Sequence, residues 1–406
     1  MDLTVIVVLV ILLALFFDFT NGFHDTANAM ATPIATGAMK PKVAVALAAV
    51  LNLVGAFLST EVAKTISGGI IREGSKGVEI TPTLIYAGLV GAIIWNMVTW
   101  LFGLPSSSSH ALFGGLIGAA IVGIGFHAVD FGVLLDKVIL PALASPFIAG
   151  VVAYVTTKLA YGITRRYDGR PDGRGSFRYG QIFSSSLVAL SHGTNDAQKT
   201  MGVITLTLIA AGVQPAGADP EVWVIAACAT AIALGTYTGG WRIIRTLGSG
   251  LTDIKPAQGF AAETSTAATI LASSHLGFAL STTQVASGSV IGSGLGRRGS
   301  SVRWKTARRI GFGWLLTLPS AAVVGALAAW AADFGVIGIL IDTILGVAVI
   351  VAIFVISGRN AVNARNAVDA VQGVSEVAES ARAVKIRKVK PLTKPERRKK
   401  DGTEAP

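Results

Sequence analysis

Two aspartates inside apolar sequence are the residues of this chain best suited to chemistry. Asp25 lies in Gly22–Met30, and Asp196 lies 171 residues later in a similar segment, Gly193–Met201. In each copy a glycine precedes the aspartate by three residues, and an amide or amine side chain follows it by three, on the same helical face. A carboxylate within a membrane segment costs about 2.5–3.5 kcal/mol on insertion scales, so it normally faces a partner or a water-filled cavity.

We interpret these aspartates as a cation or proton site shared by the two copies. The glycine before each one permits the helix to open and to offer backbone carbonyls beside the carboxylate. The alternative is structural, with Asp25 and Asp196 acting as interhelical ion-pair partners, for example of Lys199. We favour the functional interpretation because the duplication preserves the aspartates specifically.

Hydroxyl side chains form a second duplicated pattern. Ser106–Ser109 lies in Gly103–His110, and it returns 174 residues later as Ser281–Thr283 within Gly277–Gln284. Several hydroxyls, together with the free backbone N–H groups of a helix start, form an anion site that suits an oxyanion. Such runs also cap helices or bond back to carbonyls. The occurrence of two matching runs favours anion binding.

Further polar residues beside these motifs are candidates for modulating the site. Histidine titrates near neutrality, so it could relay protons or sense the charge of an anion, and the alternative is a packed, hydrogen-bonded side chain. Another carboxylate in an apolar segment is either functional or part of a structural pair. The modulating residues that we expect are His24, His110, Lys199, Glu263 and Gln284.

The composition indicates which elements must position these residues. Of 406 residues, 52% are hydrophobic and 14% are charged, against about 25% charged in soluble proteins. Mean hydropathy is +0.62, and apolar runs long enough to cross about 30 Å of hydrocarbon cover most of the chain. We therefore predict an all-α polytopic membrane protein with about 10–12 transmembrane segments and with interrupted or re-entrant helices. Cys228 is the single cysteine, which excludes a disulfide framework.

Lysine and arginine are distributed unevenly between the loops. If eleven apolar runs are simple crossings, 28 basic residues fall on one side and 4 on the other. The positive-inside rule then places the N-terminus outside and the C-terminal tail in the cytoplasm. The net charge of +11 is therefore a topology signal and does not indicate nucleic acid.

This topology also gives the two copies opposite orientations, because each motif and its copy then run in opposite directions across the membrane. We predict a first transmembrane repeat, a basic cytoplasmic loop, a second inverted repeat, an additional transmembrane helix and a basic disordered cytoplasmic tail. These regions are 1–160, 161–178, 179–331, 332–357 and 358–406.

The motifs resemble those of the inorganic phosphate transporter (Pit) family, especially its bacterial low-affinity members. The resemblance spans residues 1 to about 357 and rests on Asn21–Ala29, Ile94–Asn96 leading into Gly103–His110, Ser191–Met201 and Ser281–Thr283. It implies secondary active import of inorganic phosphate, coupled to a cation gradient, by alternating access of two inverted repeats. It implies neither an enzyme nor a cofactor, and no fixed metal site.

The resemblance also assigns roles to individual residues. The positions that it links to the cation are Asp25, Asn28, Asn195 and Asp196. The positions that it assigns to a phosphate cradle are Ser107, Ser108, Ser109, Ser281, Thr282 and Thr283.

This chain departs from the family's Gly-x-Asn-Asp-x-x-Asn pattern at two positions, His24 and Lys199. Both departures remove a neutral oxygen ligand, and Lys199 adds a positive charge. They favour a proton-driven symporter of the plasma membrane over one with a symmetric two-sodium site. The resemblance to bacterial members also leaves open import of phosphate as a neutral metal–phosphate complex. The alternatives left open are a sodium-coupled phosphate symporter and a carrier of another oxyanion such as sulfate. The partners expected are inorganic phosphate, a co-transported proton or Na⁺, the lipid bilayer and, as an assembly left open, a homodimer.

Overall fold

The computed structural model describes residues 2–69, 80–167, 176–276, 280–359, 361–364 and 367. Within that part of the chain every regular element is a helix. The long elements are α1 (Leu3–Ala35), α2 (Pro41–Gly55), α3 (Glu61–Gly69), α4 (Pro82–Leu101), α5 (Ser108–Gly123), α7 (Leu140–Tyr167), α8 (Ser176–Ala210), α9 (Val222–Thr238), α11 (Pro256–His275), α12 (Thr282–Gly296), α13 (Trp304–Ala332) and α14 (Val336–Arg359). Two short helices, α6 (Phe131–Leu134) and α10 (Trp241–Arg245), each continue into a π-helical turn.

Five of these helices are long and apolar enough to cross a membrane, and the count is six if the bent pair of α9 and α10 is one span. The chain bends by 58° between those two helices. Helix α8 has 35 residues, but its serines and its Asp196 motif lower its hydropathy. The all-α membrane fold predicted from the sequence is confirmed. The number of crossings stays a prediction, and the predicted tail 358–406 lies almost wholly outside the described residues.

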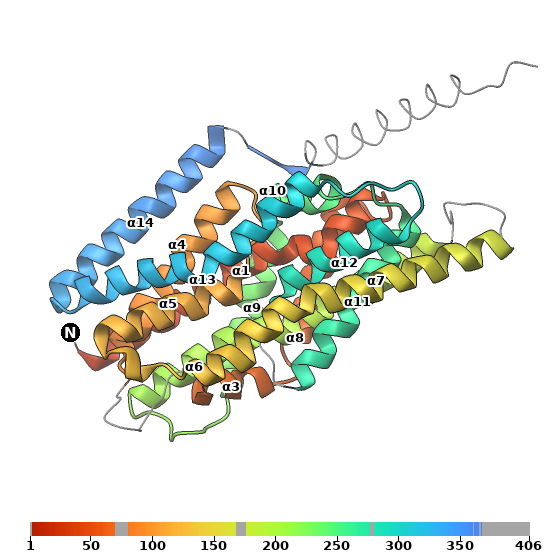
Figure 1. The fold of residues 1–406 in the computed structure, drawn as a ribbon. Coiled ribbons are helices and arrows are strands. Elements are labelled where there is room, and N and C mark those ends of the chain that lie inside the picture. The colour runs from red at the N-terminus through yellow and green to blue at the C-terminus, as the bar shows by residue number, and fades with distance from the viewer. Residues whose placement is uncertain are drawn as a thin grey trace, which may run out of the picture.

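Helices α1 and α8 carry the two aspartate motifs through the middle of the bundle (Figure 1). Both are continuous helices at their aspartates, so the expectation that Gly22 and Gly193 open the backbone is wrong. These glycines instead permit close approach. A Cβ on Gly22 would lie 2.3 Å from the carbonyl oxygen of Ile232 on α9, and one on Gly193 would lie 2.2 Å from that of Asn52 on α2.

The two hydroxyl motifs lie in the connections of two helical hairpins. In the first hairpin, the end of α5 returns to the start of α4, where Gly123 approaches Leu84. In the second hairpin, the end of α12 returns to the start of α11, where Arg297 donates to the carbonyl oxygen of Asp253 over 3.4 Å. The connection of the first hairpin lies near Arg242 and Arg309, which donate to the carbonyl oxygens of Leu101 and Phe102.

Basic residues thus gather at the end of the bundle where α1 finishes and α8 begins. Arg178 donates to the carbonyl oxygen of Ala38 there, over 3.2 Å, and Arg303 donates to that of Ser249. The connection of the α4–α5 hairpin points toward this end, whereas the α11–α12 hairpin has its free ends here. The two hydroxyl motifs therefore approach the middle of the bundle from opposite ends. Helix α14 lies at one edge, against α4 and α13 (Figure 1).

Candidate functional site

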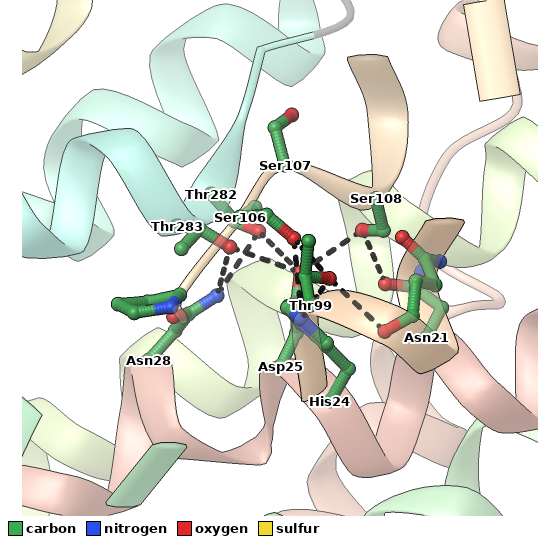
Figure 2. Close-up of polar contacts among 12 residues, drawn as sticks. Asn21, His24, Asp25, Asn28, Thr99, Ser106, Ser107, Ser108, Thr282 and Thr283 are labelled. Atoms are coloured by element: carbon green, nitrogen blue, oxygen red, sulfur yellow. Dashed lines mark hydrogen bonds and ion pairs between the residues drawn. The ribbon is translucent and has the colours of Figure 1, made fainter. Parts of the chain in front are cut away.

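Asp25 is the centre of a buried polar cluster and is 2% exposed. Its Oδ1 lies 2.5 Å from Nδ1 of the adjacent His24. Three hydroxyls lie within hydrogen-bond distance of its Oδ2, those of Ser108 (3.1 Å), Thr283 (3.2 Å) and Thr282 (3.4 Å). Figure 2 shows these side chains converging on Asp25 from the starts of α5 and α12. One carboxylate thus collects hydroxyl donors from both duplicated runs.

Asp196 joins the same cluster from α8. Its Oδ2 accepts from Thr282 over 3.0 Å and lies 2.9 Å from Nε2 of His192, one turn earlier on the helix. Its Oδ1 pairs with Lys199, whose ammonium also donates to the carbonyl oxygen of Leu280 over 3.1 Å. The ion pair considered as the structural alternative therefore exists for Asp196, but within one helix rather than between two. Because the Thr282 hydroxyl lies within hydrogen-bond distance of both aspartates and can donate to either, the two copies form one site.

The predicted cradle hydroxyls divide into two groups. Ser107 and Ser281 cap α5 and α12, accepting from the backbone N–H groups of His110 (3.2 Å) and Gln284 (3.3 Å). Figure 2 shows Ser107 turned away from Asp25. Ser109 donates to a carbonyl oxygen in the opposite motif, over a long 3.5 Å. The hydroxyls that reach the carboxylates are those of Ser108, Thr282 and Thr283.

The two predicted asparagines flank the carboxylates and keep an oxygen free. Asn28 donates through Nδ2 to Thr283 over 3.1 Å, and Asn195 donates through Nδ2 to Ser274 over 2.9 Å. Both amide Oδ1 atoms are buried and have no hydrogen-bond partner among the described residues. These neutral oxygens are available to a cation or to a donor on a substrate.

Hydrogen-bond directions locate a proton between His192 and Asp196. Thr236 donates to the carbonyl oxygen of Ile232, so its hydroxyl oxygen accepts from Nδ2 of Asn52 over 2.7 Å. The amide oxygen of Asn52 then faces Nδ1 of His192 at 3.3 Å, and that ring nitrogen must carry a hydrogen. Because Nε2 of His192 faces a carboxylate oxygen of Asp196, one of these two atoms must also carry a proton.

The same reasoning applies to His24. Thr99 donates to backbone carbonyls and Ser106 donates to Thr99 over 2.7 Å, so the oxygen of Ser106 can only accept. It lies 3.4 Å from Nε2 of His24, which is therefore the donor of that weak contact. Since Nδ1 of His24 faces Asp25, this pair also needs a proton between its two members (Figure 2).

A metal ion is the other species that the cluster could attract. One ligand atom each from Asp25, His192 and Asp196 lie within 4.8 Å of one another. The carboxylate oxygens already accept from hydroxyls, and Lys199 places a positive charge on Asp196. Adding a divalent cation beside that ammonium is electrostatically unfavourable, so the donor set suits protons better.

Three predicted modulators lie away from the carboxylates. His110 and Gln284 line a mostly apolar groove of about 820 Å³ between α7, α12 and α13, with Arg308 among its lining residues. Glu263 on α11 accepts from Thr32, from Ser184 over 2.6 Å and from Gln181 over 3.1 Å. Neutral donors therefore satisfy this carboxylate outside the central cluster.

Sequence reasoning missed several members of the cluster. Asn21 accepts from Ser108 over 2.6 Å. It stands at the position that matches His192 in the duplication, so the repeat could have indicated this residue. Asn52 is the one polar residue of α2 apart from Lys42 near its start, and it has no such signal. Asp18, seven residues before Asp25, is a carboxylate in an apolar run, and that was a usable signal.

The chain matches a model of the phosphate transporter family over residues 21–325. It is 55% identical, over 358 residues, to a probable low-affinity inorganic phosphate transporter of Mycobacterium leprae, covering 87% of this chain and 85% of the relative. It is 58% identical over 322 residues to the protein of that name from Mycobacterium tuberculosis, covering 79% and 76% respectively. These relatives are named as transporters and not as enzymes. A solved structure titled "The sodium-dependent phosphate transporter" shares the fold at a TM-score of 0.71 and 24% identity, covering 82% of this chain and 100% of that one.

Proposed function

The chain belongs to the phosphate transporter family, and from this premise we propose that it is a symporter that imports inorganic phosphate with protons. The observation that carries the proposal is the pair of histidine–aspartate contacts, each of which needs a proton. The same aspartates hold the hydroxyls of Ser108, Thr282 and Thr283. A single cluster thus joins proton-binding groups to the donors that suit a tetrahedral oxyanion.

The shared hydroxyls supply a coupling mechanism. While Asp25 is ionised, it holds the Thr283 hydroxyl as a donor and competes with Asn21 for that of Ser108, so neither hydroxyl is available to an anion. Protonation of the carboxyl group weakens it as an acceptor, and those hydroxyls are then free to donate to phosphate. Protonation also removes negative charge that would repel the entering anion. Phosphate therefore binds well only to the proton-loaded site.

Lys199 favours protons over sodium as the coupling ion. Its ammonium occupies the space beside Asp196 and the carbonyl oxygen of Leu280, both of which would otherwise be ligands for a cation. A second cation next to a buried ammonium is repelled, whereas a proton can be held between a histidine and an aspartate. The protein of the solved structure is titled sodium-dependent, and at 24% identity that likeness concerns the fold alone.

We also propose that the bundle consists of two inverted repeats, with the N-terminus outside. Reciprocal glycine contacts support this. Gly22 approaches α9 as Gly193 approaches α2, and Gly118 approaches α13 as Gly292 approaches α7. The gathering of arginines at one end supports a cytoplasmic side there. Alternating access then moves one set of helices past the other around the shared aspartates.

The substrate is tested by uptake of labelled phosphate into proteoliposomes that contain the purified protein. We expect excess unlabelled phosphate to compete fully and excess sulfate to compete little, because a protonated oxyanion can donate to the free oxygens of Asn28 and Asn195. Equal competition by sulfate would instead favour a general oxyanion carrier.

Lys199→Asn is expected to change the coupling ion. The substitution removes the ammonium and leaves Asp196, the free oxygen of Asn195 and the carbonyl oxygen of Leu280 to a cation. We expect an inward sodium gradient to stimulate uptake by the variant about fivefold, the scale of a modest coupling free energy, and to leave the original protein unaffected.

Lys64→Asn is the matched control for this variant. Lys64 lies on α3 and pairs with Glu61 and Asp219 on the surface, so its loss should leave the ion response unchanged. A Lys199→Asn protein that keeps its full response to a proton gradient and gains none to sodium would contradict the assignment.

A further inference from the structure

Asp18 is a buried carboxyl group that the proposed coupling mechanism does not use. It lies on α1 and is 0% exposed, and neither of its oxygens has a hydrogen-bond partner among the residues described. The side chain that faces it is Thr200 on α8. The hydroxyl of Thr200 is equally buried and equally without a partner of normal geometry in the described part of the bundle. An unsatisfied buried pair of this kind is costly, so packing alone does not account for it.

Within the described part of the bundle, the positive charges near Asp18 are already paired with another carboxylate. The charged and titratable groups that face it are Asp196, His192 and Lys199 on α8, and the thiol of Cys228 lies nearby on α9. Lys199 is paired with Asp196, and His192 lies 2.9 Å from the same carboxylate. An ionised Asp18 would therefore be a buried charge without a counter-ion and would also be repelled by Asp196.

A proton is the ion that fits this position. Oxygen-bound metal cations take several oxygen ligands, and the side chain found facing Asp18 supplies a single hydroxyl. A proton needs one carboxylate oxygen and makes the group neutral. Protonated Asp18 can donate to the oxygen of Thr200, which satisfies both groups at once.

Asp18 and Thr200 also lie on the two helices that carry the central aspartates. Asp18 precedes Asp25 by seven residues, two helical turns, on the same helix, and Thr200 follows Asp196 by four residues, one turn, on α8. Buried chains of acidic and histidine side chains mark proton pathways in membrane proteins. With the N-terminus outside, Asp18 lies between the outer side and the cluster.

We propose that Asp18 is a second proton-binding residue, which takes the coupling proton from the outer side before the central cluster receives it. The proposal rests on the proton-coupled transport inferred above. The proton binds to the Asp18 carboxylate. Once the pair of His192 and Asp196 has released its own proton inward, the proton on Asp18 passes by way of the Thr200 hydroxyl to that pair and leaves Asp18 ionised and ready for the next proton. Asp18 does not touch phosphate; it loads the site that does.

The test separates proton-driven accumulation from phosphate exchange in proteoliposomes. Exchange of internal for external phosphate at equal pH needs the binding site but no net proton movement. We expect Asp18→Asn to exchange phosphate within about twofold of the original protein, while its accumulation driven by a proton gradient falls about tenfold or more. Protons taken up per phosphate, measured with an internal pH dye, should fall as well.

Asp342→Asn is the control, because Asp342 is an aspartate of α14 at the edge of the bundle. It should retain both reactions. If Asp18→Asn cannot be isolated as a folded protein, Asp18→Glu is measured instead. The glutamate variant should still accumulate phosphate, but its displaced carboxyl group should shift the dependence of uptake on external pH.

Accumulation by Asp18→Asn with the original proton count would overturn the proposal. If Asp18→Asn loses both phosphate exchange and proton-driven accumulation, the proposal is also overturned, because Asp18 would then be needed for the fold or for phosphate binding. An unchanged pH dependence in Asp18→Glu would overturn it as well. Failure of the original protein to respond to a proton gradient would instead refute the proposed coupling, and with it the role of Asp18.

Discussion

Asparagine in place of Asp25 is expected to abolish phosphate accumulation, lowering it about a hundredfold or more, the scale of losing a positioned proton-transfer group. Asparagine has nearly the shape of aspartate, but it carries no charge and cannot take up and release a proton. The proton between His24 and residue 25 loses its carboxylate acceptor. The hydroxyls of Ser108 and Thr283 then face an amide, which does not switch between an ionised and a protonated form. Asp196→Asn should have a similar effect and should also leave Lys199 buried without its partner.

The measurement is uptake of labelled phosphate in cells and in proteoliposomes, with the amount of protein in the membrane determined for each variant. Asp342→Asn serves again as the control for loss of an aspartate from an apolar helix. Normal uptake by both Asp25→Asn and Asp196→Asn, with protein levels unchanged, would remove the basis for placing the site here.

The second large effect concerns stability. Gly22→Ala and Gly193→Ala each add a single methyl group, but its carbon would lie 2.3 or 2.2 Å from a backbone carbonyl oxygen of the neighbouring helix. Backbone cannot move aside as a flexible side chain can, so α1 must separate from α9, or α8 from α2. We expect each substitution to lower the free energy of unfolding by about 1–3 kcal/mol, the usual cost of overpacking.

Gly346→Ala in α14 is the matched control, because a Cβ at that position meets nothing within 4 Å. Alanine there should be neutral or stabilising by up to about 1 kcal/mol, since glycine is a poor helix former. Thermal unfolding of the purified proteins in detergent distinguishes the three variants. If all three have the same Tm, the helix approaches seen here are not tight, and the glycines would need another explanation.

The members of the site could be predicted from sequence where the duplication recorded them. Asp25 and Asp196 stand at matching positions, and the hydroxyls that reach them come from the matching Ser/Thr runs. The duplication did not indicate which hydroxyls have which role. Ser107 and Ser281 cap helices, whereas their neighbours reach the carboxylates. That division depends on the direction of each side chain around a helix start, and residue type alone does not carry it.

Other features depended on contacts between distant segments. Asn52 belongs to the cluster because α2 packs against α8 and brings its amide to His192, and nothing in its own neighbourhood indicates this. Gly22 and Gly193 were expected to open their helices because they precede aspartates, whereas their role is to let another backbone approach. A glycine in a membrane helix permits either outcome, and only the partner helix decides between them.

Proton coupling is the central claim, and separate ion gradients test it most directly. The purified protein is reconstituted in proteoliposomes, and phosphate uptake is measured with a proton gradient and a sodium gradient imposed one at a time. We predict accumulation when the outside is more acidic and sodium is absent, with no stimulation by an inward sodium gradient at equal pH. A strict requirement for sodium would contradict the account, because the buried histidine–aspartate pairs and Lys199 would then not determine the coupling ion.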